Sequence, residues 1–193
     1  MDDRKHTTVP RKVSKHDPAA SYRTLSREDF DAIVTGELTH VAVWLELELE
    51  TAIENYFAVR SDTREAFSRL ILQREGMAFQ TKIDIVRIIV SGNEFKQEYK
   101  DQWKGVLLRI EEIKRVRNAM AHGKDVGGQG LTIKVGYISR SGKETEIEIE
   151  PNSHAARMAE AEKLQDDLHE LVAGIQDARI VPTASDRRGP SKG

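Results

Sequence analysis

The sequence predicts a mainly helical fold, an antiparallel bundle of helices with one β-hairpin appendage near residues 131–150. Two observations support this fold class. Apolar residues recur every three or four positions over most of the chain, as they do in helices that bury one side. Apolar and polar residues alternate over residues 131–149, on both sides of a Ser-Gly turn, which is typical of a hairpin.

The composition suits one domain with polar ends, because 38% of the 193 residues are hydrophobic and 32% are charged. We expect a disordered arm over residues 1–22, which show no periodicity, and a disordered basic tail over residues 179–193. The folded domain then covers residues 23–178 and includes the hairpin. An isolated hairpin is marginal in water, so its apolar face must pack on the helices.

The first two expected helices are separated by a glycine. Ser26 predicts a helix start, because Asp29 follows it at the spacing of a capping box, and Gly36 interrupts this helix. The second helix is expected over residues 37–59. Leu and Glu alternate over residues 45–50 as in a strand, but the wider window has helical spacing. Its apolar stripe consists of Leu38, Val41, Leu45, Leu49, Ala52, Ile53, Tyr56 and Phe57.

Four further segments continue the helical pattern. Two helices are expected over residues 63–75 and 78–90, with Gly76 between them. An amphipathic helix follows over residues 101–124. The last helix begins near Pro151, after the hairpin. Its stripe consists of Met158, Ala161, Leu164, Leu168, Leu171, Val172 and Ile175.

Several classes of protein are excluded or disfavoured. The chain has no cysteine, so it has no disulfide and no thiolate metal site. It shows no apolar run of membrane-spanning length and no signal-like start, and we expect a cytoplasmic protein. It contains neither a GxxxxGK[ST] loop nor an HExxH motif. The acidic run over residues 46–54 is interpreted as a solvated face. The histidines other than His122 lack ligand spacing, so we expect no metal and no cofactor: they are His6, His16, His40, His154 and His169.

The charge is unevenly distributed, although the net charge is only −2. Residues 104–124 carry six Lys or Arg against two Glu, whereas the chain without its basic ends carries −7. A basic helix in an acidic body is a candidate site for an anion. On charge alone, a solvated helix with ordinary i,i+4 pairs is the better explanation.

Arg117 occupies an unusual position in this helix. On a helical wheel it lies in the middle of the apolar side, with Ile110 and Ile113. A guanidinium is costly to bury unpaired, so it needs a carboxylate, carbonyls, a phosphate or water. One interpretation is a structural ion pair with Asp84 or Glu46. The other is a functional cation.

His122 ends the same helix, about 140° around the axis from Arg117, and shares a face with Asn118. Asn118 is therefore a candidate to contact the His122 ring. Gly123 follows as a left-handed helix stop. The segment thus combines a fixed cation with an imidazole, the side chain that titrates nearest neutrality.

The string Arg117-Asn118-Ala119-Met120-Ala121-His122 resembles the R-x4-H motif of HEPN domains, including the Asn after the Arg. Long antiparallel helices, with the motif near the end of a late helix, are also similar to that family. Phe79-Gln80-Thr81-Lys82-Ile83 resembles the segment that precedes the motif helix in some bacterial members. The resemblance covers residues 35–175 and implies an HEPN-like bundle, in which the hairpin is an insertion.

The resemblance implies a metal-independent endoribonuclease, a toxin or defence RNase that acts as a homodimer on RNA. His122 would be the general acid and base, Arg117 would stabilise charge on the phosphate, and Asn118 would position His122 or the phosphate. An antitoxin or a nucleotidyltransferase is the expected protein partner. The alternative is a non-catalytic HEPN-like module that binds a protein or nucleotide, with Arg117 and His122 structural. The expected contacts to the RNA backbone are Lys114, Arg115 and Lys124.

Three apolar residues give the expected dimer some support of their own. Leu108 and Val116 lie on the polar side of the motif helix, and Leu47 lies off the stripe of its own helix. Such residues are more often ordinary surface apolar residues than parts of an interface.

Overall fold

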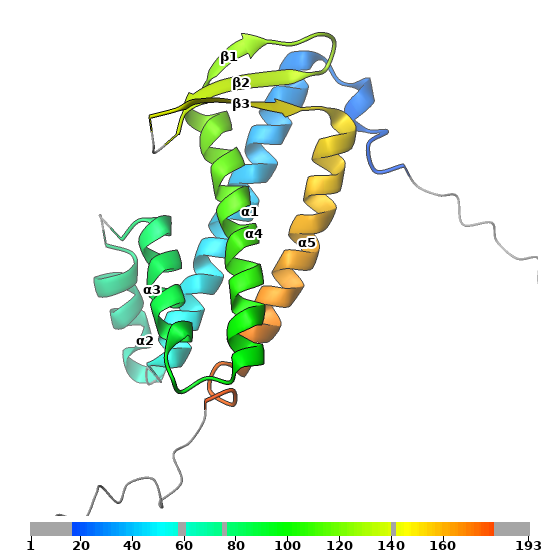
Figure 1. Ribbon diagram of the computed structural model, residues 1–193. Coiled ribbons are helices and arrows are strands. Elements are labelled where there is room, and N and C mark those ends of the chain that lie inside the picture. The colour runs from blue at the N-terminus through cyan, green and yellow to red at the C-terminus, as the bar shows by residue number, and fades with distance from the viewer. Residues whose placement is uncertain (1–16, 58–60, 75–76, 140–141, 180–193) are drawn as a thin grey trace, which may run out of the picture.

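A computed structural model describes residues 17–57, 61–74, 77–139 and 142–179 (Figure 1). The fold is mainly helical, with a small three-stranded antiparallel sheet, so the predicted fold class is confirmed at this level. The long helices are α1 (Arg27–Tyr56), α3 (Phe79–Ser91), α4 (Gln97–His122) and α5 (Pro151–Gly174). The shorter elements are η1 (Tyr22–Thr24), α2 (Ser61–Phe67), the π-helical turn η2 (Ser68–Leu72), β1 (Lys124–Gly127), β2 (Ile133–Ile138) and β3 (Glu144–Ile149).

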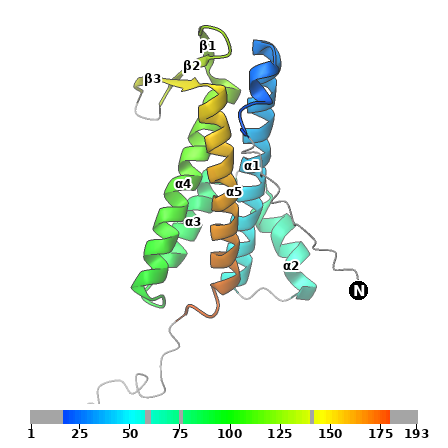
Figure 2. The same cartoon turned by 90° about the vertical axis from the view of Figure 1, so that its right-hand side faces the viewer.

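Helices α1, α4 and α5 run side by side along the molecule, and α3 packs against α1 and α4 (Figures 1 and 2). Helix α2 lies outside this bundle, as Figure 2 shows most clearly. The sheet lies across one end of the bundle, where α4 ends and α5 begins. None of the helices in the described ranges is long and apolar enough to cross a membrane.

Helix α1 is continuous through Gly36, so the expected interruption there is wrong. Phe30, Val34 and Leu38 follow one another at four-residue spacing and are each fully buried. Their burial outweighs the cost of about 1 kcal/mol that a glycine imposes inside a helix. The predicted start is confirmed, because the Ser26 side chain accepts a hydrogen bond from the Asp29 N–H at 3.1 Å.

The other helices differ from the predictions mainly at their ends. The helix expected over residues 63–75 is divided into α2 and η2, which together end at Leu72. Helix α3 agrees with the expected range 78–90 to within a residue. Helix α4 begins four residues before the expected start at residue 101 and ends at His122. These shifts leave the predicted motif on one uninterrupted helix.

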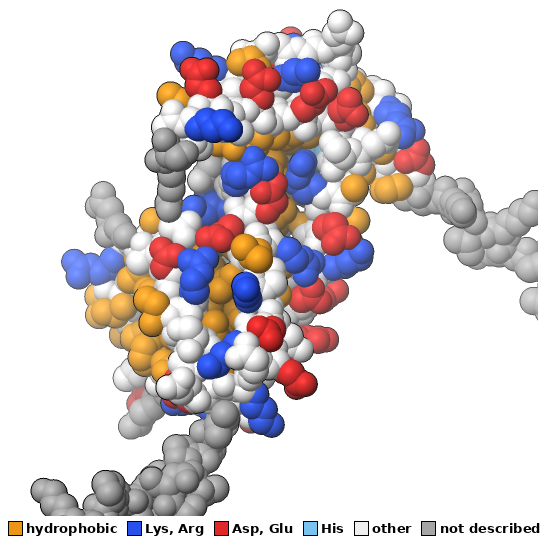
Figure 3. Space-filling model, in the orientation of Figure 1, with side chains coloured by type: hydrophobic (Ala, Val, Ile, Leu, Met, Phe, Trp, Pro, Cys, Tyr) orange, Lys and Arg blue, Asp and Glu red, His pale blue; other side chains and the backbone are white. Residues whose placement is uncertain are grey.

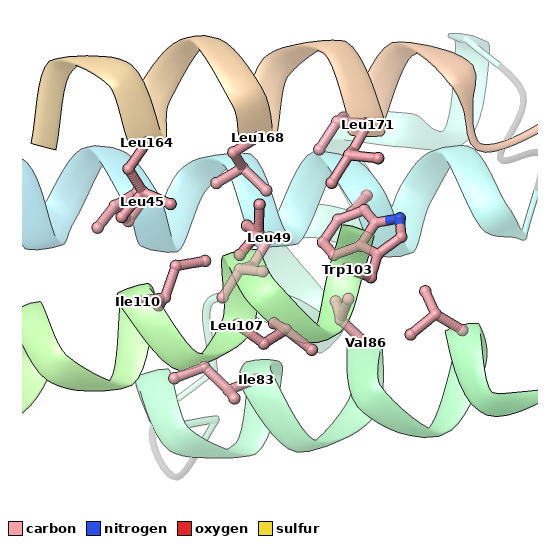
Figure 4. Packing of buried hydrophobic residues seen from close by; sticks show 14 of the residues in the cluster. Leu45, Leu49, Ile83, Val86, Trp103, Leu107, Ile110, Leu164, Leu168 and Leu171 are labelled. Carbon is pink, nitrogen blue, oxygen red and sulfur yellow. The ribbon is translucent and has the colours of Figure 1, made fainter. Parts of the chain in front are cut away.

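The main core fills the middle of the bundle, where side chains from α1, α3, α4 and α5 meet (Figure 4). Trp103 is its largest fully buried side chain. Around it pack leucines and isoleucines at helical spacing, which confirms most of the apolar positions predicted for α1 and α5. Phe57, expected in the stripe of α1, is instead 59% exposed. The side chains labelled in Figure 4 include Leu45, Leu49, Ile83, Leu107, Ile110, Leu164 and Leu168.

The predicted hairpin is confirmed as β2 and β3, and Ile133 pairs with Ile149 at its base. A third strand, β1, was not predicted. It has only four residues, three of them exposed and the fourth a glycine, so it shows no apolar alternation. β1 pairs with β2 and completes the order β1-β2-β3.

The sheet covers a second core at its end of the bundle. The hairpin face packs on α1 and α4, as expected from the instability of a lone hairpin. Val116 is fully buried there, so it does not belong to the outer surface of α4 and cannot contribute to a dimer interface. The buried members of this cluster are Phe30, Val34, Leu38, Val116, Ala119, Ile133, Val135, Ile147 and Ile149.

Both ends of the described chain contact the bundle. Residues 17–22 were expected in the arm, but Ala19 is buried and Tyr22 donates a hydrogen bond to Glu37 at 3.0 Å. Arg179, expected in the tail, pairs with Glu94 at 3.1 Å. The packed part of the chain therefore extends beyond the expected range at both ends. The rest of the expected arm and tail, residues 1–16 and 180–193, lies outside the described residues.

Candidate functional site

The predicted motif occupies the last turns of α4, directly beneath the sheet. The helix stops there because Gly123 turns into extended backbone, with φ −77° and ψ 172°. The expected left-handed stop is therefore wrong. A glycine is needed at position 123 because there is no room for a side chain. A Cβ there would clash with Val135 Cγ1 and lie 2.6 Å from the Ala119 carbonyl oxygen, so β2 packs closely on the end of the motif.

Arg117 is half-buried, and no carboxylate pairs with it among the described residues. Its Nε atom is buried and forms no hydrogen bond. The two acids expected for a structural ion pair are engaged elsewhere: Asp84 pairs with Arg87 at 2.7 Å, and Glu46 pairs with Lys82 at 2.5 Å. The structure thus contradicts the ion-pair interpretation of Arg117.

His122 is exposed at the end of α4, and Asn118 is half-buried one turn earlier. The two side chains share a face of the helix, as their four-residue spacing requires. Within the described part of the chain, no hydrogen bond joins Asn118 to His122. Asn118 therefore does not fix the His122 ring by a hydrogen bond in this structure. The imidazole is therefore accessible to a ligand from solvent.

The three expected RNA-binding residues lie in different surroundings. Lys114 Nζ donates to Gln80 Oε1 at 2.7 Å. Arg115 donates to both carboxylate oxygens of Glu112, at 2.5 and 2.7 Å, and to the Tyr137 hydroxyl at 2.8 Å. Lys124 is exposed on β1. Two of the three cations are thus already engaged by groups of the same chain.

The helix geometry also separates the predicted residues around α4. Arg115 lies about 160° around the helix axis from Arg117, on the opposite side of the helix. Asn118 and His122 lie between them, nearer to the direction of Arg115. One face of α4 therefore presents Arg115, Asn118 and His122, while Arg117 lies on another side of the helix and is half-buried.

A buried ion cluster between α1 and α3 was not predicted. Lys82 is 3% exposed and contacts Glu46 at 2.5 Å and Glu50 at 2.6 Å. Burial by itself lowers the pKa of Lys82, but the hydrogen bonds and charges of the two glutamates raise it overall. Glu50 and Glu54 are also buried, so the interpretation of residues 46–54 as a solvated face is wrong.

A second unpredicted cluster lies where α1, α5 and η1 meet. His154 is fully buried, and its Nε2 atom lies 2.6 Å from Glu37 Oε2. The Tyr22 hydroxyl donates to the same carboxylate. Burial lowers the pKa of His154 despite Glu37, and burial together with Glu37 raises the pKa of Tyr22 to about 12. The neutral imidazole therefore donates from Nε2 to Glu37, and its Nδ1 atom has no partner.

The same signal that identified Arg117 in the sequence could have found these residues. His154 and Arg157 continue the three- and four-residue spacing of the stripe Ala161, Leu164 and Leu168 on α5. Lys82 likewise continues the apolar stripe of α3, three residues after Phe79 and four before Val86. A charged residue in an apolar stripe indicates either a buried pair or a ligand site.

Grooves elsewhere on the surface do not contain the motif. One groove of about 460 Å³ lies between α4 and α5, and includes Gln102, Arg109 and Asp167. Another of about 400 Å³ lies between α1 and α2. The described residues contain no group of three or more His, Asp or Glu that could hold a metal ion.

Comparison of the chain with protein-family models, with curated proteins and with solved structures finds no match. The functional argument therefore depends on the geometry of the chain itself and on the motif that α4 carries.

Proposed function

We propose that this protein is an HEPN-like endoribonuclease that cuts RNA without a metal ion. The observation that carries the proposal is the combination of Arg117 and His122 on one helix. Arg117 is half-buried and lacks a carboxylate partner, while His122 is exposed five residues later. A cation without a carboxylate partner, on the same helix as an exposed imidazole, suits stabilisation of a phosphate during proton transfer.

In the proposed reaction the RNA supplies its own nucleophile. His122 accepts the proton of a ribose 2′-OH as that oxygen bonds to the adjacent phosphorus. The bond from phosphorus to the 5′-oxygen breaks, and an imidazolium protonates the leaving oxygen. Arg117 stabilises the negative charge on the phosphoryl oxygens, and Asn118 positions the phosphate. The products are a 2′,3′-cyclic phosphate and a free 5′-hydroxyl.

A homodimer would supply two copies of His122, one as base and one as acid. Exposed apolar side chains give this assembly some support. Leu47 is 50% exposed and Val43 is 49% exposed, one turn apart on α1, and Leu108 is 59% exposed on α4. Contiguous exposed apolar side chains mark interaction surfaces, whereas single ones are ordinary.

A second candidate function is a non-catalytic module that binds a partner protein, such as an antitoxin or a nucleotidyltransferase. The engagement of Lys114 with Gln80, and of Arg115 with Glu112, favours it, because these cations are less free to contact RNA. The exposed apolar residues on α1 would then contact the partner instead of a second copy.

The experiment that separates the two functions is cleavage of total RNA and of tRNA by purified protein in EDTA. His122→Ala and Arg117→Ala should each reduce the rate by about a hundredfold or more, because each removes a group that acts in the transition state. His169→Ala is the matched control. It removes an exposed histidine from α5, and we expect no change in rate.

The outcomes are distinct. Cleavage by the wild type that is lost in both site variants, with the control unchanged, supports the ribonuclease. The absence of cleavage by the folded wild type, or equal rates in all variants, contradicts it. The wild type should also sediment as a dimer, and a monomer that cleaves would contradict the shared site.

A further inference from the structure

Arg157 is a second cation without a partner, on the other side of α4 from Arg117. It lies on α5, one turn after the buried His154, and is itself half-buried. Its terminal NH1 atom is buried and forms no hydrogen bond. Among the described residues, no carboxylate forms an ion pair with it. A guanidinium does not lose its proton in proteins, so the buried NH1 group needs a hydrogen-bond acceptor.

An acid that acts on Arg157 already has another partner. Glu112 interacts electrostatically with Arg157, but both of its carboxylate oxygens accept hydrogen bonds from Arg115. Arg115 also donates to the Tyr137 hydroxyl on β2, which fixes its guanidinium beneath the sheet. The three charged groups Arg115, Arg157 and Glu112 therefore leave one positive charge unneutralised.

Arg115 and Arg157 also interact electrostatically. Burial lowers the pKa of Arg157 most, Glu112 opposes this shift, and the charge of Arg115 adds to it. In Figure 3 basic side chains are visible on the surface just below the sheet, between α4 and α5. Two guanidinium groups with only one carboxylate between them can together bind an oxyanion.

We propose that Arg157 and Arg115 form a binding site for a phosphate group. A phosphate offers several acceptor oxygens and a negative charge, which would satisfy the NH1 atom of Arg157 and offset the excess charge. Arg115 takes part with the N–H groups that Glu112 and Tyr137 leave unused, since a guanidinium has five donors. The site is separate from Arg117 and does not require that the protein cut RNA.

The position of this site relates it to His122. Arg115, Asn118 and His122 share one face of α4, and the helix rises about 10 Å between the first and the last. A single strand of nucleic acid that follows this face would place one backbone phosphate at Arg157 and a later one near His122. The same site could instead hold the phosphate of a free nucleotide.

The test is binding to the full-length protein, measured with three probes in a phosphate-free buffer. The probes are inorganic phosphate, a 5′-mononucleotide, and a short single-stranded 2′-O-methyl RNA with hydroxyl ends, which has no free 2′-OH nucleophile and cannot be cut. Arg157→Gln should weaken binding by about tenfold or more, because a charge-assisted hydrogen bond is lost. Arg109→Gln is the matched control, since Arg109 has the partner Asp167 in the same α4–α5 seam.

Each outcome decides a question. Loss of RNA binding in Arg157→Gln, with Arg109→Gln close to the wild type, supports the site and assigns it to a polynucleotide backbone. Loss of mononucleotide and phosphate binding alone supports the site and assigns it to a free phosphate ester. No binding by the wild type, or equal weakening in both variants, overturns the proposal. Thermal unfolding of each variant confirms that it is folded.

RNA cleavage separates this result from the proposed ribonuclease activity. If the wild type binds through Arg157 but does not cut RNA, the phosphate site stands and the catalytic proposal fails. If His122→Ala loses cleavage while Arg157→Gln retains both cleavage and binding, the catalytic proposal stands and the phosphate site fails.

Discussion

Among the described residues, buried cations are paired with carboxylates in the middle of the bundle and lack such pairs at its sheet-covered end. In the middle, Lys82 is almost fully buried and contacts Glu46 and Glu50 at 2.5 and 2.6 Å. At the end beneath the sheet, Arg117 and Arg157 each have a buried guanidinium atom without a hydrogen bond. In the first region, carboxylates of the same chain offset the cost of burying the cation. In the second region, no group of the described chain accepts a hydrogen bond from the buried atoms.

This difference separates a structural charge from a functional one. A buried charge with complete pairing loses stability when either partner is removed. A partly buried charge without a partner destabilises the folded chain until water or a ligand supplies the missing acceptor. The comparison therefore predicts opposite effects on stability for similar substitutions in the two regions.

The largest effect is expected for Lys82→Ala. This change leaves the buried Glu50 carboxylate and its neighbour Glu46 without a cation, and we expect a loss of about 3 kcal/mol or more in the free energy of unfolding. Urea unfolding measures it. Lys163→Ala removes an exposed lysine that pairs with Glu160 and should change stability by less than about 1 kcal/mol. Equal effects of the two variants would show that the Lys82 cluster is not structural.

A smaller loss is expected for Gly123→Ala, which tests how the sheet packs on the motif. The new methyl group would clash with Val135 and with the Ala119 carbonyl oxygen, at a cost of about 1–3 kcal/mol. Gly36→Ala is the matched control, because a Cβ there meets nothing within 4 Å. In that helix interior alanine should stabilise by about 0.5–1 kcal/mol. A harmless Gly123→Ala would mean that β2 does not pack so closely on α4.

The opposite sign is expected for Arg157→Met. Methionine keeps much of the side-chain volume and removes a half-buried guanidinium whose NH1 atom has no hydrogen bond, so the ligand-free protein should gain about 1 kcal/mol. The melting temperature in phosphate-free buffer measures this gain. A clear drop in the melting temperature would assign Arg157 a structural role like that of Lys82.

The smallest effect concerns pH and His154, which faces Tyr22, Glu37 and Arg157. Its pKa is lowered in the folded state by burial, so the unfolded chain binds more protons between that value and 6.5. Stability should therefore fall as the pH drops below about 6.5, by at most about 1.4 kcal/mol per pH unit from this group. His154→Gln should flatten this part of the profile. An unchanged slope would exclude His154 as its source.

The sequence predicts the helical elements and the motif helix because apolar spacing reports burial directly. It fails where a tertiary contact overrides a local signal. Gly36 lies inside a helix because the apolar stripe of α1 on both sides of it is buried. Val116 was expected on the polar side of α4, but it is buried because the sheet covers it. The short strand β1 has no alternation of its own and exists through its pairing with β2.

The candidate site was predicted in part because apolar spacing also shows where a charged residue enters a buried stripe. Arg117 is recognisable because it interrupts an apolar stripe, and Lys82 and Arg157 interrupt theirs in the same way. The spacing cannot say which of these cations finds a partner, since the partner comes from another helix. Lys82 contacts two glutamates of α1, whereas Glu112, which acts electrostatically on Arg157, is paired with Arg115.

The decisive measurement is the melting temperature of the wild type, Arg117→Met and Arg157→Met, with and without saturating 2′-O-methyl RNA. Without RNA, both variants should melt at or above the wild type. With RNA, the wild type should gain stability, and each variant should gain clearly less. Two arginine variants that melt well below the wild type and gain as much from RNA would contradict a ligand-binding role for the unpaired cations.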